Sequence, residues 1–178
     1  MLRARIPKLL KPLSLFKGIG CAPAKGVLAK NLAAVQVQME EHRMLRELIE
    51  SILGYTRPDS TGETVAGQER HERWIREVRH ALALLHESVS VHFRHEEAGM
   101  LEASVLESYG SHRDTAARLR DEHTELLSQI GAVRRLADQK GRETEMMKRL
   151  NDLCVRLRAH ESAENQLVGA LFGIEMAG

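Results

Sequence analysis

Near the C-terminal end of the chain, apolar residues recur at alternating steps of three and four, and two polar residues stand within the series. Its members are Leu150, Leu153, Leu157, His160, Glu164, Leu167 and Leu171. Because an α-helix turns once in about 3.6 residues, these steps keep all of the side chains on one face. Such a face predicts a helix that packs against other helices. The same spacing turns a histidine and a glutamate toward the packed interior.

Three further segments show helical periodicity. The first follows Gly26 and ends at Gly54, the second runs from about Gln68 to about Ala103, and the third lies between Ser111 and Gly141. The segment at 150–171 belongs to a fourth helix that begins near Arg142. Turn-forming residues separate the helices, as in the stretch TRPDSTGET at 56–64. Four amphipathic helices with short connections predict an all-α fold, an antiparallel up-down four-helix bundle.

Charge divides the chain into two parts. Residues 1–39 contain seven basic residues and no acidic one, whereas residues 40–178 contain 19 basic and 25 acidic residues, a net charge of −6. We assign residues 1–27 to a basic N-terminal arm and residues 28–176 to the bundle. The acidic bundle is not expected to bind nucleic acid, so contact with a protein partner or an anionic surface is expected through the arm.

Targeting is one alternative reading of the arm, because GIGC at 18–21 and the acid-free start are weakly similar to targeting segments. We favour packing of the arm's apolar residues against the bundle or a partner; these are Leu2, Ile6, Leu9, Leu13 and Phe16. No apolar run approaches the roughly 18 residues of a membrane span. Cys21 and Cys154 lack the spacing of a zinc or dithiol motif. We therefore expect a reduced, cytoplasmic protein.

Each predicted helix places a histidine on its apolar face, and two of the helices add a glutamate four residues later. The six residues are His42, His92, Glu96, His123, His160 and Glu164. Residues four apart lie about 40° apart around a helix, so each His-Glu pair points one way. Buried titratable groups are costly when they lack partners. Two metal ions, each held by two histidines and sharing both carboxylates, would satisfy all six groups.

Ligand type narrows the metal, because imidazole with carboxylate suits iron or manganese and also permits zinc. A ferritin-like bundle would offer Glu-x-x-His on two helices. This chain has that order only once, from Glu77 to His80, so the ferritin-like arrangement fits it less well.

The order of the motifs resembles the hemerythrin-like family, also called HHE cation-binding domains. That pattern is a lone histidine, then HxxxE, then a histidine, then a second HxxxE, and the resemblance covers residues 30–172. It implies a centre of two non-haem iron ions, with manganese or zinc less expected. It also implies that Glu96 and Glu164 bridge the ions and that the four histidines are terminal ligands.

The chain departs from the oxygen-carrying members of that family at two positions. Those proteins have another histidine one turn after the third ligand, where this chain has Leu127, and an aspartate five residues after the last histidine. Here Glu164 follows at four residues. The chain is more similar to bacterial hemerythrin-like proteins, including those linked to nitrosative stress and iron-sulfur cluster repair. Repair proteins tend to carry an N-terminal cysteine pair, whereas this arm has only Cys21.

The sequence thus predicts a di-iron protein that binds or reacts with O2, NO or peroxide, in sensing, iron handling or a stress response. Whether it is an enzyme stays open, with peroxide- or NO-related activity as the candidates. The alternative is a metal-stabilised regulatory or interaction module that acts through its basic arm. Beside the ligands, we expect His95 to lie on the flank of the site and to orient a ligand, and Glu97 to lie on the solvated surface.

Overall fold

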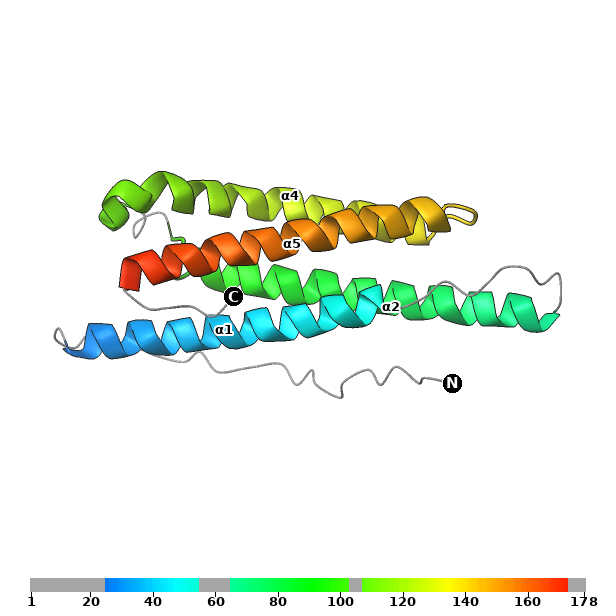
Figure 1. Cartoon of the computed structure of the whole chain (residues 1–178), viewed down its shortest axis with the longest axis horizontal. Helices are drawn as coiled ribbons and strands as arrows, with labels where there is room; N and C mark the ends of the chain where they lie inside the picture. The colour runs from blue at the N-terminus through cyan, green and yellow to red at the C-terminus, as the bar shows by residue number, and fades with distance from the viewer. Residues whose placement is uncertain (1–24, 55–64, 103–106, 173–178) are drawn as a thin grey trace.

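The computed structural model describes residues 25–54, 65–102 and 107–172. These residues form four α-helices, α1 (Lys25–Leu53), α2 (Val65–Glu97), α4 (Arg113–Ala137) and α5 (Glu143–Phe172), with a 3-10 helix, η1 (Glu107–His112), before α4 (Figure 1). The described ranges contain no strand, so the predicted all-α class is confirmed. Residues 1–24 of the predicted arm, with its five apolar residues, and the predicted loop at 56–64 lie outside the described residues.

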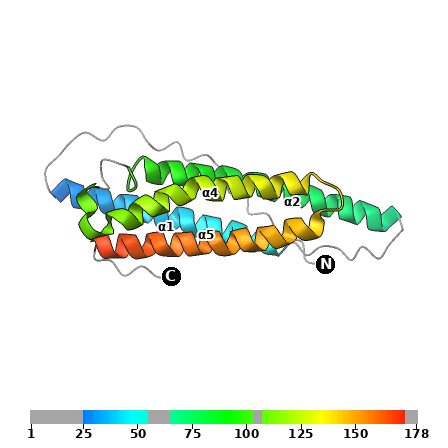
Figure 2. The ribbon, with the colours of Figure 1, turned by 90° about the horizontal axis from the view of Figure 1, so that it is seen from above.

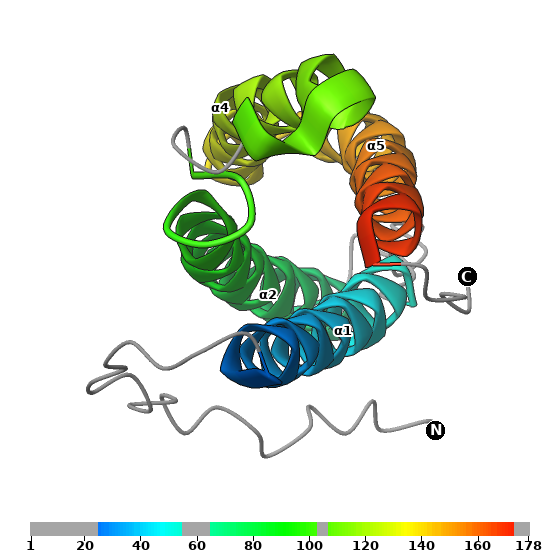
Figure 3. The same ribbon diagram turned by 90° about the vertical axis from the view of Figure 1, so that its left-hand side faces the viewer.

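Each helix packs against two others. Helix α1 contacts α2 and α5, and α4 contacts the same two helices. Viewed along their length, the four helices surround a common interior (Figure 3), and from above they lie lengthwise beside one another (Figure 2). The fold is therefore a helical bundle whose interior receives side chains from all four helices.

Two apolar clusters fill that interior. The main cluster draws on all four helices and includes Leu45, Ile49, Ile52, Trp74, Val78, Leu82, Leu85, Val89, Phe93, Leu126, Ile130, Val133, Met146, Leu150, Leu153 and Leu157. The small cluster consists of Leu101, Ala116, Leu119 and Leu167. Full burial of one such large side chain is worth about 1.5–3 kcal/mol. On α4 and α5, one predicted histidine stands between the two clusters, at His123 and His160.

Helix α2 ends at Glu97, six residues before the predicted boundary at Ala103. The reason is a turn in which the carbonyl oxygen of Glu96 accepts hydrogen bonds from the amides of Gly99 (3.1 Å) and Leu101 (2.7 Å). This turn lets Leu101 enter the small cluster, where its side chain is fully buried. The periodicity of α2 alone could not reveal the turn, because Leu101 also fits a continued helical face.

The connection between α4 and α5 agrees with the predicted break near Lys140 and Gly141. Gly141 has φ +83°, a left-handed backbone conformation that favours glycine. Its amide donates to the Glu143 carboxylate at 3.1 Å, in the first turn of α5. Within the described part of the chain, no helix is both long and apolar enough to cross a membrane.

Candidate metal centre

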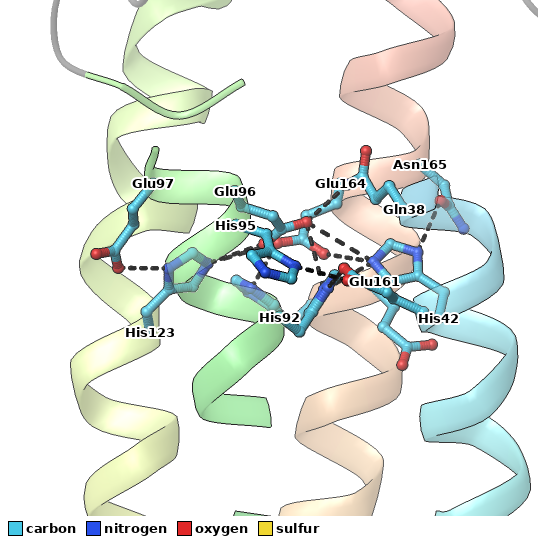
Figure 4. Close-up of polar contacts among 12 residues, drawn as sticks. Gln38, His42, His92, His95, Glu96, Glu97, His123, Glu161, Glu164 and Asn165 are labelled. Carbon is cyan, nitrogen blue, oxygen red and sulfur yellow. Dashed lines mark hydrogen bonds and ion pairs between the residues drawn. The ribbon is translucent and has the colours of Figure 1, made fainter. Parts of the chain in front are cut away.

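The six residues predicted to face the interior lie together in the middle of the bundle. His42 comes from α1, His92 and Glu96 from α2, His123 from α4, and Glu164 from α5 (Figure 4). His160 also comes from α5. Each of the six is at most 5% exposed. We call this set the polar layer.

The polar layer contains two groups of ligand atoms, and in each group all atoms lie within 4.8 Å of one another. Position A is formed by His42, His92, Glu96 and Glu164, and position B by His123, His160, Glu96 and Glu164. The two glutamates belong to both positions. Either group could hold a metal ion, because each offers two imidazole nitrogens and two carboxylate oxygens.

Both carboxylates divide their oxygens between the two positions. Glu96 turns Oε1 toward His92 Nε2 (3.3 Å) and Oε2 toward His123 Nε2 (3.4 Å). Glu164 turns Oε2 toward His42 Nε2 (3.2 Å) and Oε1 toward His160 Nε2 (2.8 Å). A carboxylate placed in this way can bridge two ions.

The spacing of these atoms fits ligands around a cation. Two ligand atoms that are each about 2.1 Å from one ion lie about 3.0 Å apart at a right angle and about 3.4 Å apart at a tetrahedral angle. The Nε2 atoms of His42 and His92 are 3.1 Å apart. Several buried atoms of the layer make no hydrogen bond of normal geometry, namely Glu96 Oε2, His123 Nε2, His160 Nε2 and both carboxylate oxygens of Glu164. Unpartnered buried groups are costly, and a cation between them would remove that penalty.

The outer nitrogen of every histidine in the layer faces an oxygen from a neighbouring helix. Nδ1 of His92 lies 2.9 Å from Glu41, Nδ1 of His123 lies 2.8 Å from Glu97, and Nδ1 of His160 lies 2.9 Å from Glu122. Nδ1 of His42 lies 3.2 Å from Oδ1 of Asn165. When these oxygens accept a hydrogen bond from Nδ1, the lone pair of each Nε2 points into the layer. That tautomer is the one that metal coordination through Nε2 needs.

The charges in the layer depend strongly on one another. Burial lowers the pKa of His42, but the carboxylates of Glu164 and Glu96 outweigh burial and raise it to about 10. The same balance raises the pKa of His123 to about 9. Burial also raises the pKa of Glu164, yet the neighbouring histidines hold it well below its usual range. Without a metal, His42 and His123 therefore hold protons at neutral pH, and a metal ion would have to displace them.

Two of the outer carboxylates are ionised for a similar reason. Burial raises the pKa of Glu41 and Glu122, but hydrogen bonds outweigh it and lower both values. The donors are His92 and His95 for Glu41, and His160 and Arg118 for Glu122. An ionised acceptor makes an imidazole a stronger donor of electrons to a metal.

The structure corrects the prediction for Glu97 and refines the one for His95. Glu97 is 41% exposed, but its carboxylate accepts from His123 on α4 and is not simply solvated. The angle around α2 alone missed this contact because α4 packs against that flank. His95 contacts Oε1 of Glu41 at 2.7 Å, and Oε2 of the same carboxylate holds His92. His95 is thus linked to His92 through Glu41.

The residues that hold Nδ1 were otherwise missed from the sequence. Glu41 and Glu122 each precede a histidine of the layer, and Glu97 follows Glu96. A residue next to an inward-facing one lies on the flank of its helix and can reach the neighbouring helix. An acidic residue directly beside His42, Glu96 and His123 was therefore the available signal.

An aromatic side chain forms one wall of position B. The ring of Phe93 stacks on His123, with centroids 3.8 Å apart and planes 4° apart, and meets the ring of His160 edge-on at 5.4 Å. Phe93 is 3% exposed and also belongs to the main cluster. It keeps water from that side of the layer and restricts both rings. Leu127, one turn after His123, packs against the main cluster as well.

Comparison with known families gives one finding. The family model described as Hemerythrin HHE cation binding domain matches residues 33–172, a range that includes the whole polar layer. No curated protein and no solved structure matched the chain.

Proposed function

Because the chain belongs to the hemerythrin HHE cation-binding domain family, we propose that it is a non-haem di-iron protein. In this proposal His42, His92, His123 and His160 are terminal ligands, and Glu96 and Glu164 bridge the ions. Its small partner is O2, NO or peroxide, and its role lies in sensing, iron handling or a stress response.

The observation that carries the proposal is the division of both carboxylates between two histidine pairs. One metal ion would use only one oxygen from each carboxylate and would leave the other histidine pair, which is equally buried, without a partner. Two ions satisfy every group. Mixed nitrogen and oxygen ligands suit iron, which supplies one-electron chemistry and coordination sites for a small ligand when bound.

The chain's own residues prepare the layer for such ions. The oxygens around Nδ1 hold each ring in one orientation, and Phe93 and the two apolar clusters exclude bulk water. Only two histidines serve each position, because Leu127 packs into the main cluster at the place where a fifth histidine would stand. Fewer protein ligands leave more coordination sites to a small partner, which favours reaction over reversible carriage.

We also propose the antiparallel up-down path of the bundle. It is supported by Figure 1, in which the colour order of α1 and α4 runs one way and that of α2 and α5 runs the other. The cytoplasmic location and a contact of the basic arm with a protein or anionic surface stay proposals based on composition.

A second candidate function is a metal-stabilised regulatory module. It is favoured by the placement of the polar layer, which lies inside the bundle and receives residues from every helix. Metal binding at such a layer is coupled to folding. Removal of residues 1–24 leaves α1 intact and separates the two functions. Loss of partner binding with unchanged reactivity toward NO and peroxide would favour the module.

The proposal is tested by metal content and absorption spectra of the purified chain. We expect about two irons per chain and oxo-bridged charge-transfer bands, followed by spectral changes on titration with NO or peroxide. The double variant His92→Ala, Glu164→Ala should lose the iron and the bands. His80→Ala, which removes an exposed histidine from the same helix, is the matched control. A wild-type chain without metal, whose stability equals that of the double variant, would overturn the proposal.

A further inference from the structure

Positions A and B share both glutamates and each use two histidines, yet their surroundings differ. We infer that the two positions are inequivalent, and that Asn165 and Gln38 make position A the weaker one, which fills last and exchanges its ion with solution. Position B, between His123 and His160, fills first. This inference rests on the proposed two-metal function.

The first difference is the partner of the histidine Nδ1 atoms. In position B both partners are carboxylates, Glu97 for His123 (2.8 Å) and Glu122 for His160 (2.9 Å). In position A, His92 has the carboxylate of Glu41, but His42 has only the neutral amide oxygen of Asn165, at 3.2 Å. Figure 4 shows the Glu97 and Asn165 contacts on opposite sides of the layer. A neutral oxygen is a weaker hydrogen-bond acceptor than a carboxylate, so of the four Nδ1 contacts that of His42 does least to strengthen its Nε2 as a metal ligand.

The second difference concerns the oxygens of Glu96. Oε1, which faces position A, accepts a hydrogen bond from Gln38 Nε2 at 2.7 Å, and Gln38 is buried at 8% exposure. Oε2, which faces position B, accepts none. An ion in position A must therefore share its carboxylate oxygen with the amide of Gln38, or displace that amide. An ion in position B meets an oxygen whose lone pairs are available.

The third difference is the state of the ligand atoms themselves. At position B, His160 Nε2 and Glu164 Oε1 are 2.8 Å apart, but these two atoms, His123 Nε2 and Glu96 Oε2 all lack a hydrogen bond of normal geometry. At position A only Glu164 Oε2 does, because the Nε2 atoms of His42 and His92 contact each other at 3.1 Å. Phe93 also stacks against His123 and holds it in place. An ion that enters position B thus has fewer hydrogen bonds of normal geometry to break than an ion that enters position A.

The affinities of positions A and B can be measured by anaerobic titration of the metal-free full-length chain with Fe(II). Calorimetry gives the dissociation constants, and Mössbauer spectroscopy follows the bound iron. We expect two binding steps that differ by at least about tenfold in dissociation constant, the usual range for one outer hydrogen-bonding partner. His160→Ala should remove the tighter step. His42→Ala should remove the weaker step and leave one ion bound at about the wild-type first constant.

Conservative variants test the positioning residues without emptying either position. Asn165→Asp gives His42 a carboxylate and should tighten the second step about tenfold, which brings the two constants together. Glu122→Gln should weaken the first step by a similar factor. Asn151→Asp makes the same change at an exposed site on α5 and should leave both constants unchanged. A merely structural role for Asn165 would predict weaker binding of both ions in Asn165→Asp.

The outcomes separate this inference from the proposed function. Two ions that bind in one unresolved step, with constants that Asn165→Asp does not change, would overturn the inference and leave the di-iron proposal standing. Loss of the tighter step in His42→Ala would overturn it as well, because the order of filling would be reversed. A wild-type chain that binds no Fe(II) would overturn both.

Discussion

The main apolar cluster and the polar layer are buried to the same degree by the same four helices, but for opposite energetic reasons. Ile49 and His42 lie two turns apart on α1 and are 0% and 1% exposed. Removing Ile49 from water stabilises the fold by itself. Removing His42 from water is unfavourable until a carboxylate, a proton or a metal ion compensates for it. Burial alone therefore does not tell whether a helical face is structural or functional.

The contribution of the polar layer to stability should therefore depend on metal and pH, whereas that of the main apolar cluster should not.

Metal removal should cause the largest change in the free energy of unfolding, through the polar layer. At a free Fe(II) concentration about a thousand times the dissociation constant, each occupied position should add roughly 4 kcal/mol to the free energy of unfolding. Chemical denaturation with and without Fe(II) under anaerobic conditions measures the difference. The double variant His92→Ala, Glu164→Ala should show no such increase, and an equal increase in that variant would place the ions elsewhere.

Truncation in the main cluster should be nearly as harmful but independent of metal. Ile130 is fully buried there, so Ile130→Ala should lower the free energy of unfolding by about 2–5 kcal/mol. The loss should be the same with and without Fe(II), whereas Ser128→Ala, at an exposed neighbouring position, should change little. A loss that disappears on metal loading would show that the two regions are energetically coupled.

The metal-free chain should lose stability as the pH rises. The pKa of His42 is raised from 6.5 to about 10 and that of His123 to about 9, so the folded state binds more protons above the unfolded value. Their contribution is complete below pH 6.5 and is lost as the pH rises through 9 to 10, by about 1.4 kcal/mol per pH unit for each histidine.

The stability contribution of Glu164, in the same layer, depends on pH in the opposite direction. The pKa of Glu164 is held well below 4.5, so its contribution is complete above that pH and is lost as the pH falls toward the folded value. Urea unfolding of the metal-free chain across this range should show a maximum between the two limits. Stability that increases from neutral to alkaline pH would contradict the assigned protonation of the histidines.

The smallest effect should come from Phe93, which belongs to both regions. Phe93→Leu keeps an apolar side chain in the main cluster but removes the stacking on His123. The loss of the aromatic contact should lower the free energy of unfolding by about 1 kcal/mol beyond any change in buried area. The first Fe(II) binding step should weaken as well, because His123 would be held less firmly. An unchanged binding constant would limit the role of Phe93 to packing.

Much of this protein follows from spacing within single helices. Steps of three and four placed Leu150, Leu153 and Leu157 on one face and added His160 and Glu164 to it. This works because the direction of a side chain around a helix depends only on its position in that helix. The four helices and the inward direction of the polar layer were therefore accessible before any tertiary structure.

Only the tertiary structure determined the contacts between residues of different helices. The contacts of Glu97 with His123, Glu122 with His160 and Asn165 with His42 depend on which helices are neighbours and on how each is rotated. The early end of α2 likewise depends on the place that the small cluster offers to Leu101. Periodicity determines what a helix presents to the interior, but only packing determines which group meets it. The difference between positions A and B follows from that packing, because their ligand types are identical.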